Sequence, residues 1–197
     1  MWNSIGGGAG FIVGHPDAIQ LEATPGCFVN NQTKTIMDII VNWNQIRAHF
    51  SRSFGSSLHV AIASVDANHQ PTNTPIGTLF LNKDQSGFYF EKFPRKLPQH
   101  AEGSGNICIL GVNSSRWFWI KSLFKERFSS YPAVKLYAEL GQRRKATDRE
   151  IRALSRRMRF TSRLRGHQYL WANMAFVREI KVNRAEMIQL GKMTEQL

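Results

Sequence analysis

Cysteine is scarce in this chain and long hydrophobic runs are absent. The two cysteines, Cys27 and Cys108, cannot by themselves build a disulfide framework or a metal site. Cys108 lies in an apolar strand pattern, so we interpret it as a small core thiol. No apolar run approaches the roughly 18 residues of a membrane span, and no Lys or Arg precedes Lys34, so the charged start of a secretory signal is missing. These absences predict a cytoplasmic protein without a membrane partner.

The residue patterns of hydrolytic and metal enzymes are missing as well. Ser64, Ser86 and Ser104 have no nearby His and Asp partners. Six histidines are scattered without the spacing of metal ligands, namely His15, His49, His59, His69, His100 and His167. We therefore expect no metal site and interpret His59 as a hydrogen-bonded structural residue. Redox chemistry stays open, because a bound organic cofactor carries the hydride itself.

Acidic residues are few: 14 Asp and Glu stand against 26 Lys and Arg, a formal charge of +12. Most of the excess falls in one segment, which we call the basic segment. It spans residues 143–165, and its only acidic residues are Asp148 and Glu150. Its ten cations are Arg143, Arg144, Lys145, Arg149, Arg152, Arg156, Arg157, Arg159, Arg163 and Arg165. A nucleic-acid partner is one interpretation of such a segment. We favour the other, in which the arginines of its helix form a solvated face.

Residues 1–34 differ from the remainder of the chain. Gly6, Gly7, Gly8 and Gly10 surround Ala9, and no amphipathic period follows. A dinucleotide fingerprint would need glycine at position 11, which is Phe. We interpret 1–34 as a flexible N-terminal extension and expect one folded domain over 35–197.

The folded part opens with a helical pattern. Apolar residues recur at steps of three and four, with Thr35 as the expected cap, at Ile36, Ile39, Ile40, Trp43, Ile46 and Phe50. Strand patterns follow, separated by turn signals typical of antiparallel hairpins, at 58–65, 72–81, 87–91, 106–112, 117–120 and 133–141. So many strands close most easily into a barrel. The sequence predicts a mainly β fold, a β-barrel with flanking helices.

A second helix is expected to begin at Thr147, where Thr147 and Glu150 have the spacing of a capping box. Ile151, Leu154 and Met158 form its narrow apolar stripe. An aromatic connector at 166–171 leads to two final strands at 174–182 and 185–190.

An aromatic strand that runs directly into two cations is the most informative stretch of the chain. Phe88, Tyr89 and Phe90 are followed by Arg95 and Lys96. A guanidinium grips two phosphate oxygens as a fork, and an ammonium adds a second charge. The stretch predicts a phosphorylated, aromatic cofactor.

Strand order and motifs together resemble the FMN-binding split-barrel family related to pyridoxamine 5′-phosphate oxidase. The resemblance covers residues 37–190 and is sharpest over 58–112, where a Pro-Ile-Gly-Thr strand at 75–78 precedes the aromatic strand and the cations. It implies a split β-barrel of the FMN-binding type, a homodimer with FMN at the subunit interface and a small-molecule substrate, and hence a flavoprotein that acts as an oxidoreductase.

The resemblance also assigns site residues. Arg95 and Lys96 correspond to the pair that binds the FMN phosphate, and Gln99 follows one helical turn later. The strand residues that approach the flavin correspond to Gly77, Thr78, Leu79, Phe80, Tyr89 and Phe90. Three tryptophans are candidates for the shared surface or for the core, namely Trp117, Trp119 and Trp171.

The chain departs from the family pattern at two places. Residues 170–174 lack the Arg- and His-containing motif for a phosphorylated substrate, so we do not expect oxidation of pyridoxamine phosphate. Pro94 replaces a hydroxyl residue before Arg95, which removes one phosphate donor. Deazaflavin or haem is the alternative cofactor, with His100 and His167 as the haem-side candidates, and a basic nucleic-acid-binding barrel is the third hypothesis.

Overall fold

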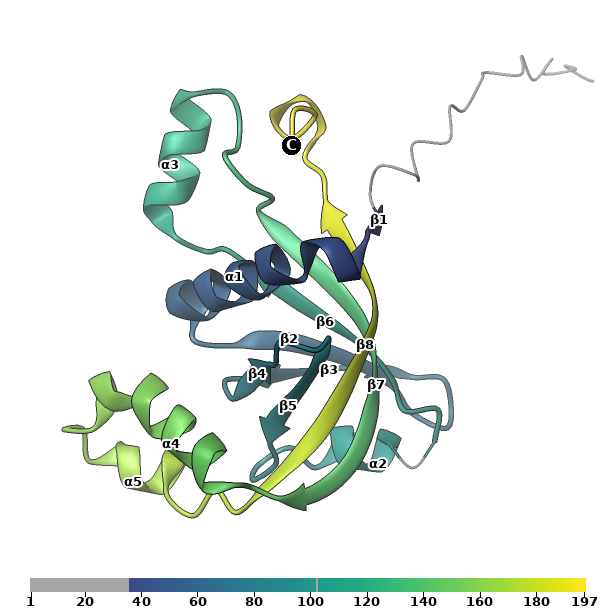
Figure 1. The fold of residues 1–197 in the computed structure, drawn as a ribbon, viewed down its shortest axis with the longest axis vertical. Helices are drawn as coiled ribbons and strands as arrows, with labels where there is room; N and C mark the ends of the chain where they lie inside the picture. Colours follow the sequence, from purple (N-terminus) through teal and green to yellow (C-terminus); the bar gives the residue numbers. More distant parts are fainter. Residues whose placement is uncertain (1–35, 102) are drawn as a thin grey trace, which may run out of the picture. The chain divides into compact units, whose positions relative to one another are not determined.

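The computed structural model describes residues 36–101 and 103–197 (Figure 1). The N-terminal extension expected at 1–34 therefore lies outside the described residues, as do Cys27 and Thr35. The described part forms an eight-stranded antiparallel sheet with flanking helices. None of the helices in this part has the length and apolarity needed to cross a membrane.

The sheet closes on itself because of one very short connection. Its strand order is β3-β2-β6-β7-β8-β5-β4, with β1 paired to β8. The end strands β3 and β4 are joined by Gly77 and Thr78 alone, and two residues span only about 7 Å. The sheet must therefore curl until its two ends meet, which confirms the predicted split β-barrel (Figure 1). The strands are β1 (Ile36–Met37), β2 (Val60–Val65), β3 (Pro71–Ile76), β4 (Leu79–Leu81), β5 (Ser86–Phe90), β6 (Asn106–Val112), β7 (Ala133–Lys145) and β8 (Phe176–Ile188).

Helix α1 (Ile39–Ser57) begins at a different cap from the one expected. The Asp38 carboxylate accepts hydrogen bonds from the backbone N–H groups of Ile40 and Val41, at 2.8 and 3.3 Å. The predicted start at Thr35 was wrong, because Ile36 and Met37 pair with β8 as strand β1 before the helix begins. Ile40 consequently falls on the outer face and is 74% exposed.

The inner core lies between α1 and the concave face of the sheet. Trp43, Ile46 and Phe50 of α1 pack against side chains such as Ile62 and Leu136, both fully buried. Burying each such side chain contributes about 1.5–3 kcal/mol to the free energy of unfolding. This core fixes the curvature of the sheet and the position of α1 across its opening.

A smaller core lies on the outer face of β5, beneath α4 (Asp148–Arg157). Leu154 and Met158 pack on Phe88 and Phe90. The capping box predicted at the start of α4 is confirmed: the Thr147 hydroxyl accepts from the Glu150 N–H, and the Glu150 carboxylate accepts from the Thr147 N–H. The first residue of the predicted stripe, Ile151, is 39% exposed.

Four predicted elements differ in the structure. The single strand expected at 72–81 is interrupted at Gly77 and Thr78 and forms β3 and β4. The strand expected at 117–120 is helix α3 (Arg116–Phe124), where Phe118 and Trp119 pack on Phe128 and no described strand pairs with them. The connector at 166–171 is helix α5 (Gly166–Trp171). The two final strands are one strand, β8, with a register shift at Asn183 that breaks its alternation. The stretch after the aromatic strand is helix α2 (Lys96–Ala101).

Candidate functional site

A buried carboxylate fixes the end of the aromatic strand β5. Glu91, only 6% exposed, accepts hydrogen bonds from Arg178 at 2.6 and 3.3 Å and from the Tyr89 hydroxyl at 3.2 Å, and it forms an ion pair with Arg143 at 3.0 Å. Burial of Tyr89, with the Glu91 charge beside it, holds the pKa of the phenol well above its usual value, so Tyr89 stays a donor. The cluster determines where the chain leaves the sheet toward the predicted phosphate ligands.

The predicted phosphate ligands lie at the start of α2. Arg95 directly precedes the helix and Lys96 begins it; both side chains are exposed, and so is Gln99. Leu97 is fully buried and anchors the helix, while His100 Nδ1 lies 2.8 Å from the Ser64 hydroxyl. The helix is thus held from beneath, and its two cations and amide are accessible.

A negative group lies near these cations on the loop after β2. The backbone N–H of Gln70 donates to Asp66 and is the main reason why the pKa of that carboxyl lies below its usual value; the charges of His100 and Lys96 lower it further. Asp66 therefore remains ionised at neutral pH and partly balances the local positive charge.

The connection between β3 and β4 is closely covered by an aromatic side chain. A Cβ atom at Gly77 would lie 3.6 Å from the ring of Trp171 and 3.1 Å from the Leu58 carbonyl oxygen. A side chain at this position would therefore push the Leu58 backbone away. Lys92 holds α5 in place, because its Nζ donates to the carbonyls of Tyr169 and Ala172 at 2.8 Å.

Two exposed rings continue this surface toward α2. Phe93 and Tyr169 are 49% and 75% exposed, with ring centroids 6.2 Å apart. The Lys92 ammonium lies 5.0 Å from the Phe93 centroid. Sequence reasoning missed Lys92, Phe93 and Tyr169, although Phe93 stands two residues before Arg95.

The predicted cofactor residues fall into two groups. Thr78, Leu79, Tyr89 and Phe90 are between 0% and 7% exposed, so their side chains belong to the protein interior. The Thr78 hydroxyl donates to the Phe90 carbonyl and accepts from the Phe90 N–H, so the connection between β3 and β4 is bonded to the aromatic strand β5. The other group comprises the accessible residues, namely Arg95, Lys96, Gln99 and, half-buried, Gly77 and Phe80.

The remaining candidates are placed as follows. Trp119 packs on Phe128 and donates to the Asn113 carbonyl at 2.7 Å, a core role, whereas Trp117 is 77% exposed. His59 Nδ1 lies 2.7 Å from the Ser57 carbonyl, and His167 Nδ1 lies 2.9 Å from the Thr161 hydroxyl. His59 thus makes the structural hydrogen bond expected of it.

The solvated face expected on α4 contains one exception. Arg152, Arg156 and Arg159 are exposed, but Arg157 is half-buried with its guanidinium over the rings of Phe54 and Phe80.

Cys108 is half-buried instead of fully buried, and burial raises the pKa of its thiol.

Comparisons with known proteins bear on this fold. No family model matches the sequence, and no curated protein matches it. Among solved structures, an FMN-binding protein from Syntrophomonas wolfei aligns with TM-score 0.51 and 13% identity, covering 77% of this chain and 95% of its own. Campylobacter jejuni ChuZ aligns with TM-score 0.51 and 10% identity, covering 80% of this chain and 59% of its own. HutZ, the heme storage protein from Vibrio cholerae, aligns with TM-score 0.42 and 12% identity, covering 75% and 90%.

The chain is therefore a protein of split β-barrel fold, and its resemblance to the FMN-binding barrels related to pyridoxamine 5′-phosphate oxidase is confirmed at the level of the fold. Two helices lie between β7 and β8 in this chain: α4 covers the outer face of β5, and α5 covers the connection between β3 and β4.

Proposed function

We propose that this chain binds FMN and acts as a flavin-dependent oxidoreductase on a small-molecule substrate other than pyridoxamine phosphate. The observation that carries the proposal is the accessible pair Arg95 and Lys96 at the start of α2, which follows the aromatic strand β5 in a split β-barrel. The S. wolfei protein of the same fold binds FMN, which supports this choice of cofactor.

The residues around α2 have the donor chemistry that a phosphate needs. Arg95 supplies a guanidinium fork, Lys96 an ammonium, and Gln99 an amide, with no buried carboxylate bonded to any of the three among the described residues. The rings of Phe93, Tyr169 and Trp171 offer apolar faces beside them. A bound flavin would supply the hydride chemistry, and these residues would hold and orient it.

The proposal includes a homodimer in which the partner chain completes the site. Side chains of the strands nearest the flavin are buried within this chain, so only part of a ring pocket is accessible from one subunit. Helix α3 carries exposed apolar side chains suited to a shared surface: Trp117, Ile120, Leu123 and Phe124 are 41–86% exposed.

The test replaces both cations. We expect Arg95→Ala with Lys96→Ala to weaken FMN binding by about tenfold or more, because a charge-assisted hydrogen bond contributes about 1.5–3 kcal/mol. The free energy of unfolding should change little, because exposed cations contribute little to it. Quenching of flavin fluorescence during titration with the full-length protein measures the affinity.

Arg152→Ala with Arg156→Ala is the matched control, since it removes two exposed cations of α4 and leaves α2 intact. Equal FMN affinity of the α2 double variant and the wild type would refute the site. A visible spectrum of the purified protein separates the alternatives, because a Soret band without flavin absorbance would assign haem, and mass analysis of the released cofactor distinguishes FMN from a deazaflavin.

A further inference from the structure

Arg157 is a half-buried cation without an acidic partner among the described residues. Its guanidinium carbon lies 3.5 Å from the ring centroid of Phe80 and 4.7 Å from that of Phe54, and it donates to the Leu79 carbonyl. Within residues 36–101 and 103–197 it forms no ion pair. Burial lowers the pKa of Arg157 to about 10, which still leaves it charged at neutral pH.

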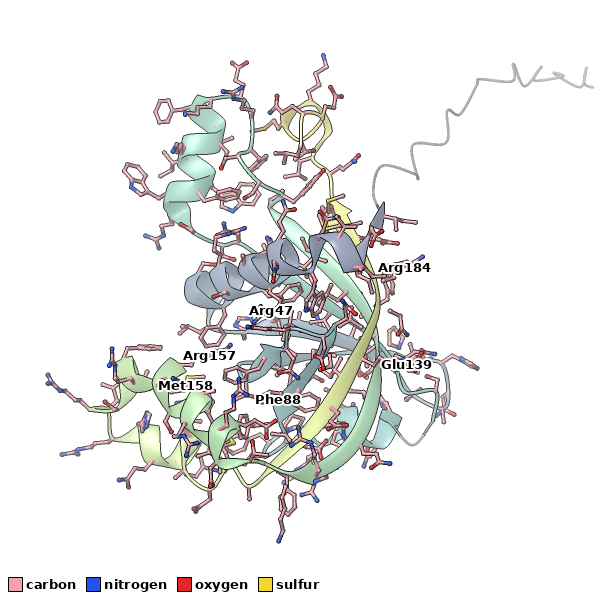
Figure 2. The ribbon with its side chains drawn as sticks, in the orientation of Figure 1. Arg47, Phe88, Glu139, Arg157, Met158 and Arg184 are labelled. Carbon is pink, nitrogen blue, oxygen red and sulfur yellow. The ribbon has the colours of Figure 1, made fainter. Side chains whose placement is uncertain are left out.

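A second arginine reaches the same place from α1. Arg47 Nε donates to the Leu81 carbonyl at 3.1 Å, and Arg47 and Arg157 line one cavity of about 210 Å³. Figure 2 shows the two arginines on α1 and α4, on either side of the space beside β4. Each guanidinium has five N–H groups and donates one of them to a backbone carbonyl, so donors remain for a ligand.

Apart from Arg47, Arg157 and Ser51, the side chains that line this cavity are apolar. Phe50, Val60, Ile76 and Leu81 are among the lining residues, and the lining found within the described chain includes no acidic side chain. A buried charge without a counter-ion is costly, and a hydrophobic residue of similar size would pack here at lower cost. The two arginines are therefore better explained by an anion that enters the cavity than by the stability of the fold.

The size of the cavity limits the ligand. A dry cavity of about 150 Å³ holds benzene, and drug-sized ligands need about 300 Å³ or more. The 210 Å³ cavity thus suits one ring or a short chain and excludes the three-ring flavin. A planar guanidinium matches a carboxylate with two parallel hydrogen bonds.

We propose that this cavity, the two-arginine cavity, binds a small aromatic or short aliphatic carboxylate, with the carboxylate at Arg47 and Arg157 and the apolar body against Val60 and Ile76. Leu79 and Phe80, two of the residues predicted to approach the flavin, line this cavity, but the proposed phosphate ligands Arg95, Lys96 and Gln99 do not, so the inference does not rest on the flavin.

The test compares phenylacetate with its neutral isostere phenylacetamide on the full-length protein by isothermal titration calorimetry. We expect the acid to bind about tenfold or more tightly than the amide, and Arg157→Met to weaken binding of the acid by a similar factor while leaving the amide unchanged. Arg156→Met, on the exposed side of the same helix, is the matched control and should bind the acid as the wild type does.

Arg47→Met provides a second variant if Arg157→Met does not fold, and it should also weaken the acid selectively. Equal affinity for acid and amide, or wild-type affinity for the acid in the arginine variants, would overturn the proposal. Phenyl phosphate binding about tenfold more tightly than phenylacetate would overturn the choice of carboxylate. The Arg95→Ala with Lys96→Ala variant should bind phenylacetate normally, so failure of the FMN proposal and failure of this one can be distinguished.

Discussion

At the scale of single residues, Glu91 determines how the aromatic strand ends. Its carboxylate lies among Tyr89, Arg143 and Arg178, and it is nearly inaccessible to solvent. An anion so placed stabilises the fold only while its cationic partners are present, and each partner depends on it in return. The position of residues 92–95, and with it that of Arg95, depends on this cluster.

We expect Glu91→Gln to lower the free energy of unfolding by about 2–4 kcal/mol, because the half-buried Arg178 would lose its counter-ion. Glu179→Gln is the matched control, because Glu179 forms an ion pair with Arg144 but its side chain is 48% exposed. This substitution should lower the free energy of unfolding by at most about 1 kcal/mol. Urea unfolding at neutral pH measures both. A loss of equal size in the two variants would contradict the structural role assigned to Glu91.

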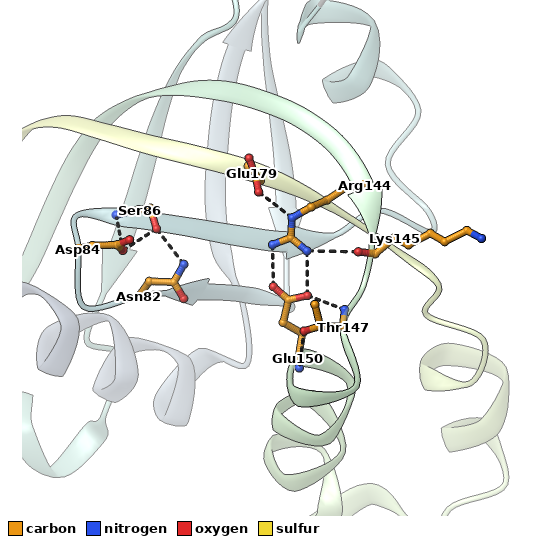
Figure 3. Close-up of polar contacts among 8 residues, drawn as sticks. All are labelled: Asn82, Asp84, Ser86, Arg144, Lys145, Thr147, Glu150 and Glu179. Carbon is orange, nitrogen blue, oxygen red and sulfur yellow. Dashed lines mark hydrogen bonds and ion pairs between the residues drawn. The ribbon is translucent and has the colours of Figure 1, made fainter.

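At the scale of elements, α4 depends on the polar network at its first turn (Figure 3). Arg144 donates to both Glu150 oxygens, at 2.8 and 3.0 Å, and pairs with Glu179 at 2.6 Å. The Arg144 guanidinium, together with the Thr147 backbone, holds the pKa of Glu150 below its usual value. The network joins the end of β7 to the helix that covers Phe88 and Phe90 and that carries Arg157.

The Glu150 network predicts a pH-dependent stability. Glu150→Gln should lower the free energy of unfolding by about 1–2 kcal/mol at about pH 7. Because the pKa of Glu150 is lower in the folded than in the unfolded protein, the stabilisation is complete above the unfolded pKa and is lost as the pH falls through the folded pKa. The difference between wild type and variant should therefore be constant above the ordinary pKa of a glutamate and shrink progressively as the pH falls below it. Urea unfolding on both sides of that pKa measures it, and a difference that stays constant below it would contradict the account.

At the scale of the whole molecule, the basic segment and helix α3 present two different kinds of surface. Much of the basic segment is solvent-exposed, but Arg143, Arg144 and Arg157 are used within the fold, for Glu91, for Glu150 and for the two-arginine cavity. Helix α3 instead exposes its apolar side chains, beside a hollow of about 600 Å³ whose lining includes Trp117 and Phe124. These exposed apolar side chains favour α3 as the surface for the proposed second copy.

We expect Trp117→Ser with Phe124→Ser to convert the proposed dimer into a monomer, because the two side chains, 77% and 86% exposed, would lose their burial against the partner. Size-exclusion chromatography with light scattering measures the mass. Phe160→Ser, at an exposed phenylalanine far along the chain, is the control. A wild type that is monomeric at all concentrations, or a double variant that stays dimeric, would contradict the shared surface.

Local patterns in the sequence were sufficient for several elements. The strand at 106–112 matches β6, and the capping box at Thr147 is present, because both depend on neighbouring residues only. The split barrel followed from a resemblance spread over the chain. By contrast, the strand predicted at 117–120 was wrong, since this run of four apolar residues lies in helix α3, where Phe118 and Trp119 pack on Phe128.

The sequence by itself determined strand β6, the start of α4 and the pair Arg95 and Lys96 beside an aromatic strand, since adjacent residues carry all three signals. Only the tertiary structure decided that Tyr89 and Phe90 are interior, that Trp171 covers Gly77, and that Arg47 and Arg157 share a cavity. The physical reason is distance along the chain: Arg47 and Arg157 are brought together by the curling of the sheet and the docking of α1 and α4, which no local pattern encodes.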